Sequence, residues 1–268
     1  MIYKLFRDWL RTILSPKVFY ALRDQIKKDN EILYIYNLLK SQKEHSVMID
    51  VGAHFGGSLI RFAFMGWEIF AFEPDNKNRK ELEELCMQYS FSNVNIDKRA
   101  VSDKEQNNLT YYTSDISTGI SGLSKFHETH IEQQEVSTTT LTKFIDENFI
   151  NKVDFLKIDT EGWDYFVLKG FPFDKIKPRV IMAEFEDRKT VPLGYDWNQM
   201  AQYLESNGYR VLVSEWYPVK EYGGNHKWRG VYKYPNSLKD VNAGGNLLAF
   251  MDNDDLNNVF SQIKKITN

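Results

Sequence analysis

The sequence predicts an α/β protein built on an open, mostly parallel sheet of seven strands, with helices on both faces. From residue 46 onward, short apolar segments of strand length alternate with segments of helical periodicity. Two of the apolar segments, about a hundred residues apart, end in glycine or acid and open into a helical pattern. Open α/β sheets present a ligand crevice in this way, at the carboxyl ends of their strands.

Seven segments have the length and apolar character of strands, and four segments between them have helical periodicity. The predicted strands are 47–52, 67–73, 93–101, 153–159, 179–186, 209–216 and 246–252. The predicted helices are 56–65, 75–89, 162–170 and 197–208. Because strands and helices alternate, we expect parallel strand pairs joined by right-handed crossovers.

The segment from about 102 to 146 interrupts this alternation. LTYYTS (109–114) and VSTTTL (136–141) have the character of strands, and the sequence between them is loop-like. Long irregular segments in compact domains are often lids. We therefore predict a β-rich insertion of antiparallel strands with a mobile loop over the crevice.

Residues 1–45 have helical periodicity and an excess of positive charge. Residues 1–40 contain eight Lys or Arg and four Asp or Glu. We expect a helical N-terminal cap packed on a single Rossmann-like domain that comprises residues 46–268. A basic amphipathic segment is also typical of two alternatives, a peripheral membrane contact and an oligomer contact.

The composition argues against several classes of function. A formal net charge of -3 does not favour a nucleic-acid partner. Cys86 is the sole cysteine, which fits a reducing compartment. No apolar run approaches the roughly 20 residues that span a bilayer, and the first residues lack the apolar run of a signal peptide. We expect a cytoplasmic protein, located at the inner membrane face if residues 1–40 bind lipid.

The first candidate site is the turn after the first predicted strand, in IDVGAHFGG. Asp50, Gly52, Ala53 and Gly56 lie there, and glycine lets the backbone approach a ligand closely. The dinucleotide fingerprint needs a second glycine where this chain has His54, which would obstruct a pyrophosphate. The turn therefore favours a nucleoside without phosphates, the alternative being an ordinary strand-to-helix turn.

Glu73 lies about twenty residues further on, at the end of the second predicted strand, and Pro74 follows it. A carboxylate in this position can accept hydrogen bonds from both ribose hydroxyls. Together with the glycine turn, it predicts a nucleoside site. The alternative is an acidic residue that only begins a helix.

Asp159 and Glu161 form the second candidate site, at the end of the fourth predicted strand. We expect both to project into the crevice opposite the first turn. A carboxylate in this place can take the proton of an attacking hydroxyl. Two close carboxylates can instead bind a divalent cation that lowers the pKa of the hydroxyl. Asp159 is also suited to cap the helix that follows.

Two further groups are candidates for contacts with a substrate. His54 adjoins the glycine turn and is a candidate substrate contact and proton acceptor. The segment 215–235 combines aromatic and basic residues and includes His226, Trp228 and Arg229. We interpret it either as a loop that stacks on a sugar or as a well-solvated loop.

At these residues the sequence resembles the FkbM family of S-adenosylmethionine-dependent methyltransferases. The resemblance covers residues 46–252 and is carried by IDVGAHFGGSLIRF, FAFEPD, KRAVSD, VSTTTLTKFI, VDFLKIDTEGWDYFVLKG and GGNLLAF. It implies a class I methyltransferase fold, which is Rossmann-like, and O-methylation of sugars or of natural-product hydroxyls.

The resemblance also implies roles for residues at the cofactor end. By position, Asp50, Gly52 and Gly56 would line the methionine and ribose end of S-adenosylmethionine, and Glu73 would hold the ribose. Ala100 and Val101, on or after the third strand, would flank the adenine.

At the other end, the resemblance implies that Asp159 and Glu161 face the transferring methyl group. We therefore expect an O-methyltransferase that acts on a small-molecule or glycan hydroxyl and releases S-adenosylhomocysteine, with Asp159, Glu161 or His54 assisting deprotonation. Two other classes stay open, an NAD-dependent oxidoreductase on the same topology and a non-catalytic binding protein that kept the fold.

Overall fold

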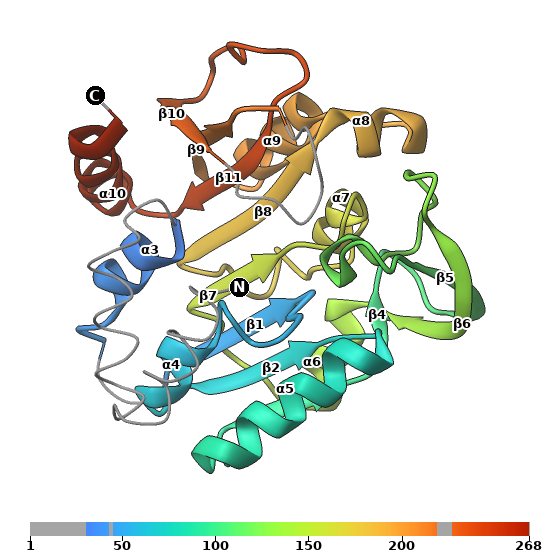
Figure 1. The fold of residues 1–268 in the computed structure, drawn as a ribbon. Coiled ribbons are helices and arrows are strands. Elements are labelled where there is room, and N and C mark those ends of the chain that lie inside the picture. Colours follow the sequence, from blue (N-terminus) through green and yellow to red (C-terminus); the bar gives the residue numbers. More distant parts are fainter. Residues whose placement is uncertain (1–30, 43–44, 219–226, 268) are drawn as a thin grey trace, which may run out of the picture.

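The computed structural model describes residues 31–42, 45–218 and 227–267. In these residues eight strands form the central sheet: β1 (Val47–Val51), β2 (Glu68–Phe72), β3 (Val94–Asp97), β7 (Phe155–Ile158), β8 (Val180–Glu186), β9 (Arg210–Trp216), β10 (Trp228–Lys233) and β11 (Gly244–Phe250). Their order is β10-β9-β11-β8-β7-β1-β2-β3 (Figure 1). The strands from β8 to β3 pair in parallel, and β11 is antiparallel to both β8 and β9.

The predicted number of strands is corrected from seven to eight. The additional strand, β10, lies within the segment 215–235, which the sequence analysis interprets as a loop. It pairs antiparallel with β9 at the edge of the sheet, and its register shifts between Trp228 and Gly230. The aromatic and basic residues are thus partly strand residues, and Gly230 interrupts the alternation that would have indicated a strand.

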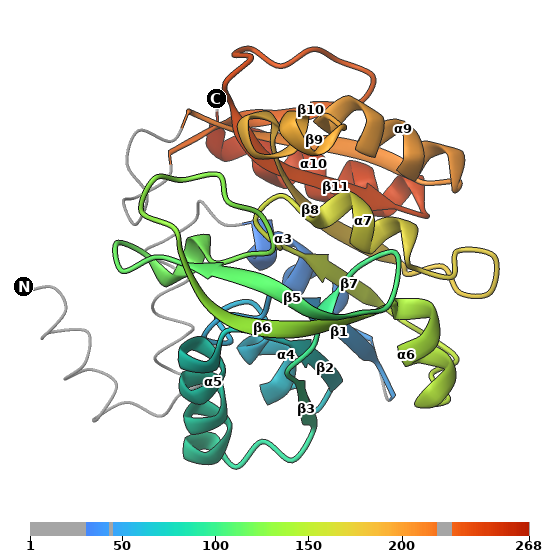
Figure 2. The same cartoon turned by 90° about the vertical axis from the view of Figure 1, so that its right-hand side faces the viewer.

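Two layers of helices enclose this sheet (Figures 1 and 2). One layer consists of α3 (Glu31–Leu39), α4 (Ile60–Phe64), α5 (Asn76–Tyr89) and α10 (Asn253–Thr267), and the other of α6 (Leu141–Glu147), α7 (Asp164–Lys169) and α9 (Trp197–Ser206). Along β1, Ile49 and Met48 face opposite layers, so the strand is buried on both sides. Among the helices of the described residues, none has both the length and the apolar character needed to span a bilayer.

The predicted N-terminal cap falls mainly on residues 1–30, which lie outside the described residues. The part that is described, α3, is fixed to the sheet by one buried carboxylate. An oxygen of Glu31 accepts hydrogen bonds from the Ser214 hydroxyl (2.6 Å), the Trp216 indole (2.7 Å) and the Asn246 amide (3.2 Å). These bonds join α3 to β9 and β11.

The insertion forms a separate three-stranded sheet of β4 (Ala100–Val101), β5 (Gln106–Thr113) and β6 (Ile131–Thr139), in the order β4-β6-β5. β5 and β6 are antiparallel as predicted, whereas β4 and β6 are parallel. Figure 1 shows this sheet at the ends toward which β1 and β7 point, and Figure 2 shows it in front of them. It therefore lies beside the carboxyl ends of the parallel strands.

The boundaries of the predicted third strand, 93–101, are corrected. Its first part is β3 of the central sheet, and its last two residues are β4 of the small sheet. β3 ends at Asp97, whose carboxylate accepts a hydrogen bond from the backbone N–H of Arg99 (2.8 Å) and pairs with the Arg99 guanidinium (2.6 Å). This local turn ends the pairing with β2 and redirects the chain into β4.

The turn after β1 packs tightly against α5. Gly56 has a φ of +79°, and a Cβ atom at this position would lie 2.8 Å from a methyl group of Leu82 and 2.8 Å from one of Leu85. Both leucines are buried. Glycine at position 56 thus lets the turn pack closely against α5, which differs from the ligand contact that the sequence predicts.

We predict that Gly56→Ala lowers the free energy of unfolding by about 2–4 kcal/mol, because it combines backbone strain with overpacking. Gly66→Ala should cost about 1 kcal/mol, since Gly66 has a similar φ of +77° but open space around it. Gly57→Ala, with no positive φ and open space, is the control and should change little. Urea unfolding measures all three, and equal losses for Gly56 and Gly66 would contradict the packing argument.

Candidate active site

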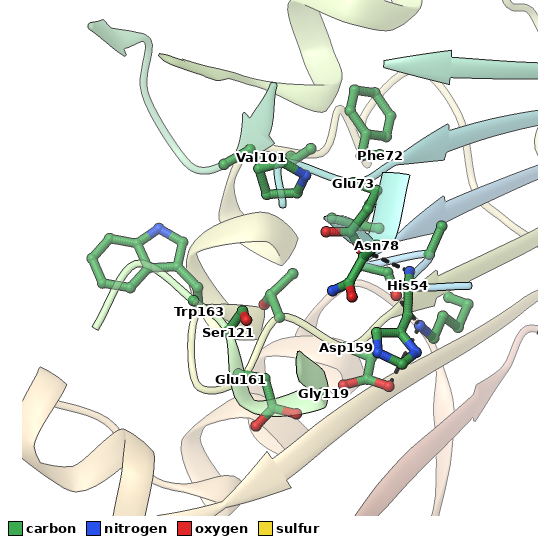
Figure 3. Close-up of a pocket in the computed structure, with 18 of the residues that line it drawn as sticks. His54, Phe72, Glu73, Asn78, Val101, Gly119, Ser121, Asp159, Glu161 and Trp163 are labelled. Atoms are coloured by element: carbon green, nitrogen blue, oxygen red, sulfur yellow. Dashed lines mark hydrogen bonds and ion pairs between the residues drawn. The ribbon is translucent and has the colours of Figure 1, made fainter. Parts of the chain in front are cut away.

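A cavity of about 320 Å³ lies where β1, β2 and β7 end, and the loop between β5 and β6 forms part of its wall (Figure 3). Nine of the residues predicted for the site line it: Gly52, Ala53, His54, Glu73, Pro74, Ala100, Val101, Asp159 and Glu161. The two stretches that the sequence analysis expects to converge, one ending in Glu73 and the other in Asp159, therefore share one cavity.

Other predicted residues lie elsewhere. Asp50 is fully buried beneath the cavity, and neither it nor Gly56 lines the wall. His226 lies outside the described residues. In β10, the Trp228 indole donates a hydrogen bond to Ser214 (2.7 Å), and Arg229 forms ion pairs with Glu215 of β9 and with Asp240 of the loop before β11. Neither Trp228 nor Arg229 is among the described residues that line the cavity.

The glycine turn joins three strands. The backbone N–H groups of Gly52 and Ala53 both donate to the carbonyl of Phe72 (3.0 Å each), at the end of β2. Gly52 has a φ of +77°, and a Cβ atom there would lie 1.8 Å from the carbonyl oxygen of Asp159. The chain after β7 thus passes directly over Gly52, and any side chain at this position would separate the two strand ends.

Glu73 is 3% exposed, and each of its carboxylate oxygens already accepts a backbone hydrogen bond. One oxygen accepts from the N–H of His54 (2.7 Å) and the other from the N–H of Asp75 (2.9 Å). Burial raises the pKa of Glu73 to about 7, although the two N–H groups oppose the shift. A carboxylate oxygen has two acceptor sites, so each can also accept from a ligand hydroxyl.

His54 has a left-handed backbone, with a φ of 50°. Its Nε2 atom lies 3.1 Å from the hydroxyl of Thr118, in the loop between β5 and β6. Burial lowers the pKa of the imidazole to about 4, so the ring is neutral at neutral pH and is a weak proton acceptor. His54 therefore connects the turn after β1 to the inserted loop.

A buried lysine connects the two candidate sites. The Nζ atom of Lys157, in the middle of β7, lies 2.7 Å from the carbonyl oxygen of Gly52, 3.2 Å from Asp50 and 3.4 Å from Asp159. Asp50 and Lys157 are direct partners across the β1–β7 pair. Burial alone would lower the pKa of Lys157, but Asp50 and Asp159 outweigh it and the pKa is raised. The lysine is therefore charged.

A second lysine neutralises the acidic side of the cavity. Lys189, in α8 (Asp187–Thr190), places its Nζ atom 2.6 Å from Glu161, 2.9 Å from Glu186 and 3.3 Å from Glu184. Burial raises the pKa of Glu161 to about 7, although Lys189 opposes the shift. Glu161 therefore holds its proton to a higher pH than an exposed glutamate does.

The alternative role of Asp159 and Glu161, binding of a divalent cation, involves Glu184 as well. One oxygen from each of Asp159, Glu161 and Glu184 lies within 4.8 Å of the other two. The ammonium of Lys189 lies within 3.3 Å of Glu161 and Glu184, so it already supplies positive charge to two members of this group.

Several residues of the site are not found by the sequence analysis. One feature of the sequence points to Lys157: it is a lysine inside the apolar strand FLKI. A buried charge requires a partner, so a lysine in such a strand indicates a nearby carboxylate. Trp163 also lines the cavity, and its indole donates to the hydroxyl of Ser102 (3.0 Å). Asn78, Ser121 and Lys189 reach the site only through the tertiary fold, and no local pattern marks them.

Comparison with known proteins assigns the family. The family model described as Methyltransferase FkbM domain matches residues 50–211. No curated protein matches the chain. One similar solved structure is precorrin-6y C5,15-methyltransferase from Geobacter metallireducens, with 12% identity and a TM-score of 0.45; the match covers 82% of this chain and 86% of that chain. Another is magnesium protoporphyrin IX methyltransferase from Synechocystis, with bound S-adenosylhomocysteine, 9% identity and a TM-score of 0.45; the match covers 93% of this chain and 94% of that chain.

The fold and the family match define a class I S-adenosylmethionine-dependent methyltransferase. The family match spans more than half of the chain, and the chain belongs to the FkbM methyltransferase family. The predicted family, fold class and cofactor are thereby confirmed, apart from the corrected number of strands. The family match also favours a methyltransferase over the oxidoreductase alternative.

We predict that Lys189→Met destabilises the protein by about 3–5 kcal/mol at pH 8, because Glu161, Glu184 and Glu186 lose their shared ammonium. Without it, the pKa values of Glu161 and Glu184, which burial already raises, would rise further above their unfolded values. Carboxyls of this kind stabilise the fold while protonated, and the contribution is lost as the pH rises through the folded-state pKa. The deficit of the variant should therefore shrink at pH 5.5, as measured by urea unfolding at both pH values.

The control for this experiment is Lys175→Met, which removes an exposed ion pair with Asp146. It should change the free energy of unfolding by less than about 1 kcal/mol at either pH. A Lys189→Met deficit that is the same at pH 5.5 and pH 8 would contradict the proposed charge balance.

Proposed function

We propose that the protein transfers a methyl group from S-adenosylmethionine to a hydroxyl of a sugar, a glycan or a related small molecule. One observation carries this proposal: Glu73, suited to hold a ribose, and Asp159 and Glu161, suited to face an acceptor hydroxyl, line the same cavity. The proposal accounts for carboxylates at both ends of the cavity, which a simple binding fold does not require.

The cofactor end of the cavity fits a nucleoside without phosphates. Glu73 offers acceptor sites for ribose hydroxyls, and Gly52 and Ala53 bring the backbone to the wall. Ala100 and Val101 supply the small apolar surface that a flat adenine ring needs. Asp50 contributes indirectly in this proposal, because it fixes the Lys157 ammonium beneath the turn.

At the acceptor end, S-adenosylmethionine supplies an electrophilic methyl group when bound. Glu161 is the best candidate for the base, because its pKa of about 7 leaves a substantial carboxylate fraction at neutral pH. Lys189 holds one of its oxygens, and the other is free of this ion pair. Asp159 is 41% exposed at its side chain and is suited to orient an acceptor hydroxyl. The neutral His54 is a weaker candidate for the base.

The charges of the wall support a neutral, hydroxyl-bearing acceptor. The carboxylate of Asp159 repels phosphate groups, and the carboxyl oxygens of Asp159 and Glu161 can accept hydrogen bonds from hydroxyls. This argues against a nucleic-acid acceptor, as does the net charge of -3. A cytoplasmic location, the division into a cap and a domain, and a lipid or oligomer contact through residues 1–40 remain predictions.

We predict that Glu73→Gln raises the Kd for S-adenosylhomocysteine about ten- to hundredfold, because hydrogen bonds to a charged acceptor are lost. In the wild type, affinity should fall as the pH drops below about 7, by up to tenfold per unit, since protonation removes the charged acceptor. In the variant this dependence should disappear. Isothermal titration calorimetry at pH 6, 7 and 8 measures both effects, and unchanged affinity in Glu73→Gln would remove Glu73 from its role.

We also predict that Asp159→Asn and Glu161→Gln leave the fold and the affinity for S-adenosylhomocysteine largely intact but reduce turnover. The loss for the base should be about 10²- to 10⁴-fold. Mass spectrometry of methyl transfer from labelled S-adenosylmethionine to candidate glycans measures it. Asp146→Asn, an exposed carboxylate on α6, is the matched control and should retain full activity. Full activity in both single variants would refute the assignment.

A further inference from the structure

The side chain of Asn78 has an unusual environment in the cavity wall. It is 2% exposed and belongs to the first turn of α5, which begins shortly after Glu73. Its amide nitrogen donates to the carbonyl of Thr118 (3.3 Å), which fixes the orientation of the amide. Its Oδ1 atom is buried, and among the described residues it has no hydrogen-bond partner.

A buried amide oxygen without a partner costs free energy, and such groups in folded proteins call for an explanation. Because Asn78 lines the cavity, a bound ligand offers that explanation. The amide nitrogen is already engaged, so the group presented to the ligand is a hydrogen-bond acceptor only. The ligand must therefore place a donor here.

We propose that Oδ1 of Asn78 accepts a hydrogen bond from a ribose hydroxyl of the cofactor, so that Asn78 and Glu73 bind the ribose together. This inference rests on the proposed function, which places the ribose at Glu73. Both residues come from the segment that links β2 to α5, and both line the cavity. In Figure 3 the Asn78 side chain lies below Glu73, between Val101 and Asp159.

The other donors of the cofactor fit this position less well. The adenine amino group belongs to the part of the cavity formed by Ala100, Val101 and Trp163. In the proposed orientation, the ammonium of the methionine belongs near the turn after β1, away from Asn78. A ribose between these two ends brings its hydroxyls to Glu73 and Asn78.

The same amide connects the cofactor to the inserted loop. Thr118 is held from two sides, at its carbonyl by Asn78 and at its hydroxyl by His54. Asn78 thus contacts the ribose with its oxygen and the loop with its nitrogen. The ribose and the inserted loop are therefore linked through a single side chain in this proposal.

Calorimetry with three ligands tests the inference: S-adenosylhomocysteine and its analogues that lack either the 2′- or the 3′-hydroxyl. Asn78→Ala should raise the Kd for S-adenosylhomocysteine roughly three- to tenfold. For the analogue without the contacted hydroxyl, the same substitution should cause no further loss. Ser124→Ala is the control, because its hydroxyl is also buried without a partner but does not line the cavity, and it should leave all three affinities unchanged.

Unchanged affinity for S-adenosylhomocysteine in Asn78→Ala would overturn the inference, and so would an equal loss for all three ligands. Asn78→Ser serves as the second variant if Asn78→Ala does not fold, with folding monitored by circular dichroism. If the wild type itself does not bind S-adenosylhomocysteine, the proposed function fails, and this outcome is distinct from failure at Asn78 alone.

Discussion

The whole site depends on the buried ammonium of Lys157. Lys157 lies within β7 and is buried. A buried ammonium group is tolerated only when nearby negative charges and hydrogen-bond acceptors compensate it. Asp50, Asp159 and the carbonyl of Gly52 provide that compensation. Because these groups come from the ends of two neighbouring strands, the ion cluster joins the turn after β1 to Asp159 after β7. Without Asp50, the Lys157 ammonium would lose its buried counter-charge, so the turn after β1 and the end of β7 are held together by the same electrostatic requirement.

The main sheet could be predicted from the sequence because its strands are buried on both faces and form nearly continuous apolar runs. The pattern is weaker at the periphery. β10 is an edge strand whose alternation is interrupted by Gly230. The run 93–101 is interrupted by three charged residues, Asp97, Lys98 and Arg99, and the structure divides it there. The division arises from the Asp97–Arg99 pair, an interaction between side chains that the apolar pattern does not record. The C-terminal helix α10 buries Leu256, Val259 and Ile263 at helical spacing, a signal that the sequence analysis did not use.

Residues of the site could be predicted from the sequence only where they come directly after a parallel strand. Glu73 and Asp159 each come directly after a parallel strand, and parallel strands end at a common edge, so their convergence follows from the alternation alone. Lys189 and Asn78 depend on how a helix after one strand packs against a loop from another sheet, which no local pattern specifies. Gly56 was recognised for a different reason than the structure gives: it accommodates α5 and does not line the cavity.

The insertion leaves the main sheet through a short turn at residues 98–99 and rejoins it near α6, and between β5 and β6 it supplies one wall of the cavity. Its strands pair with one another and not with the strands of the main sheet. Changes of length or sequence in the β5–β6 loop therefore leave the register of the main sheet untouched. The architecture is modular in this sense: one wall of the cavity can vary while the strands that end before Glu73 and Asp159 keep their pairing.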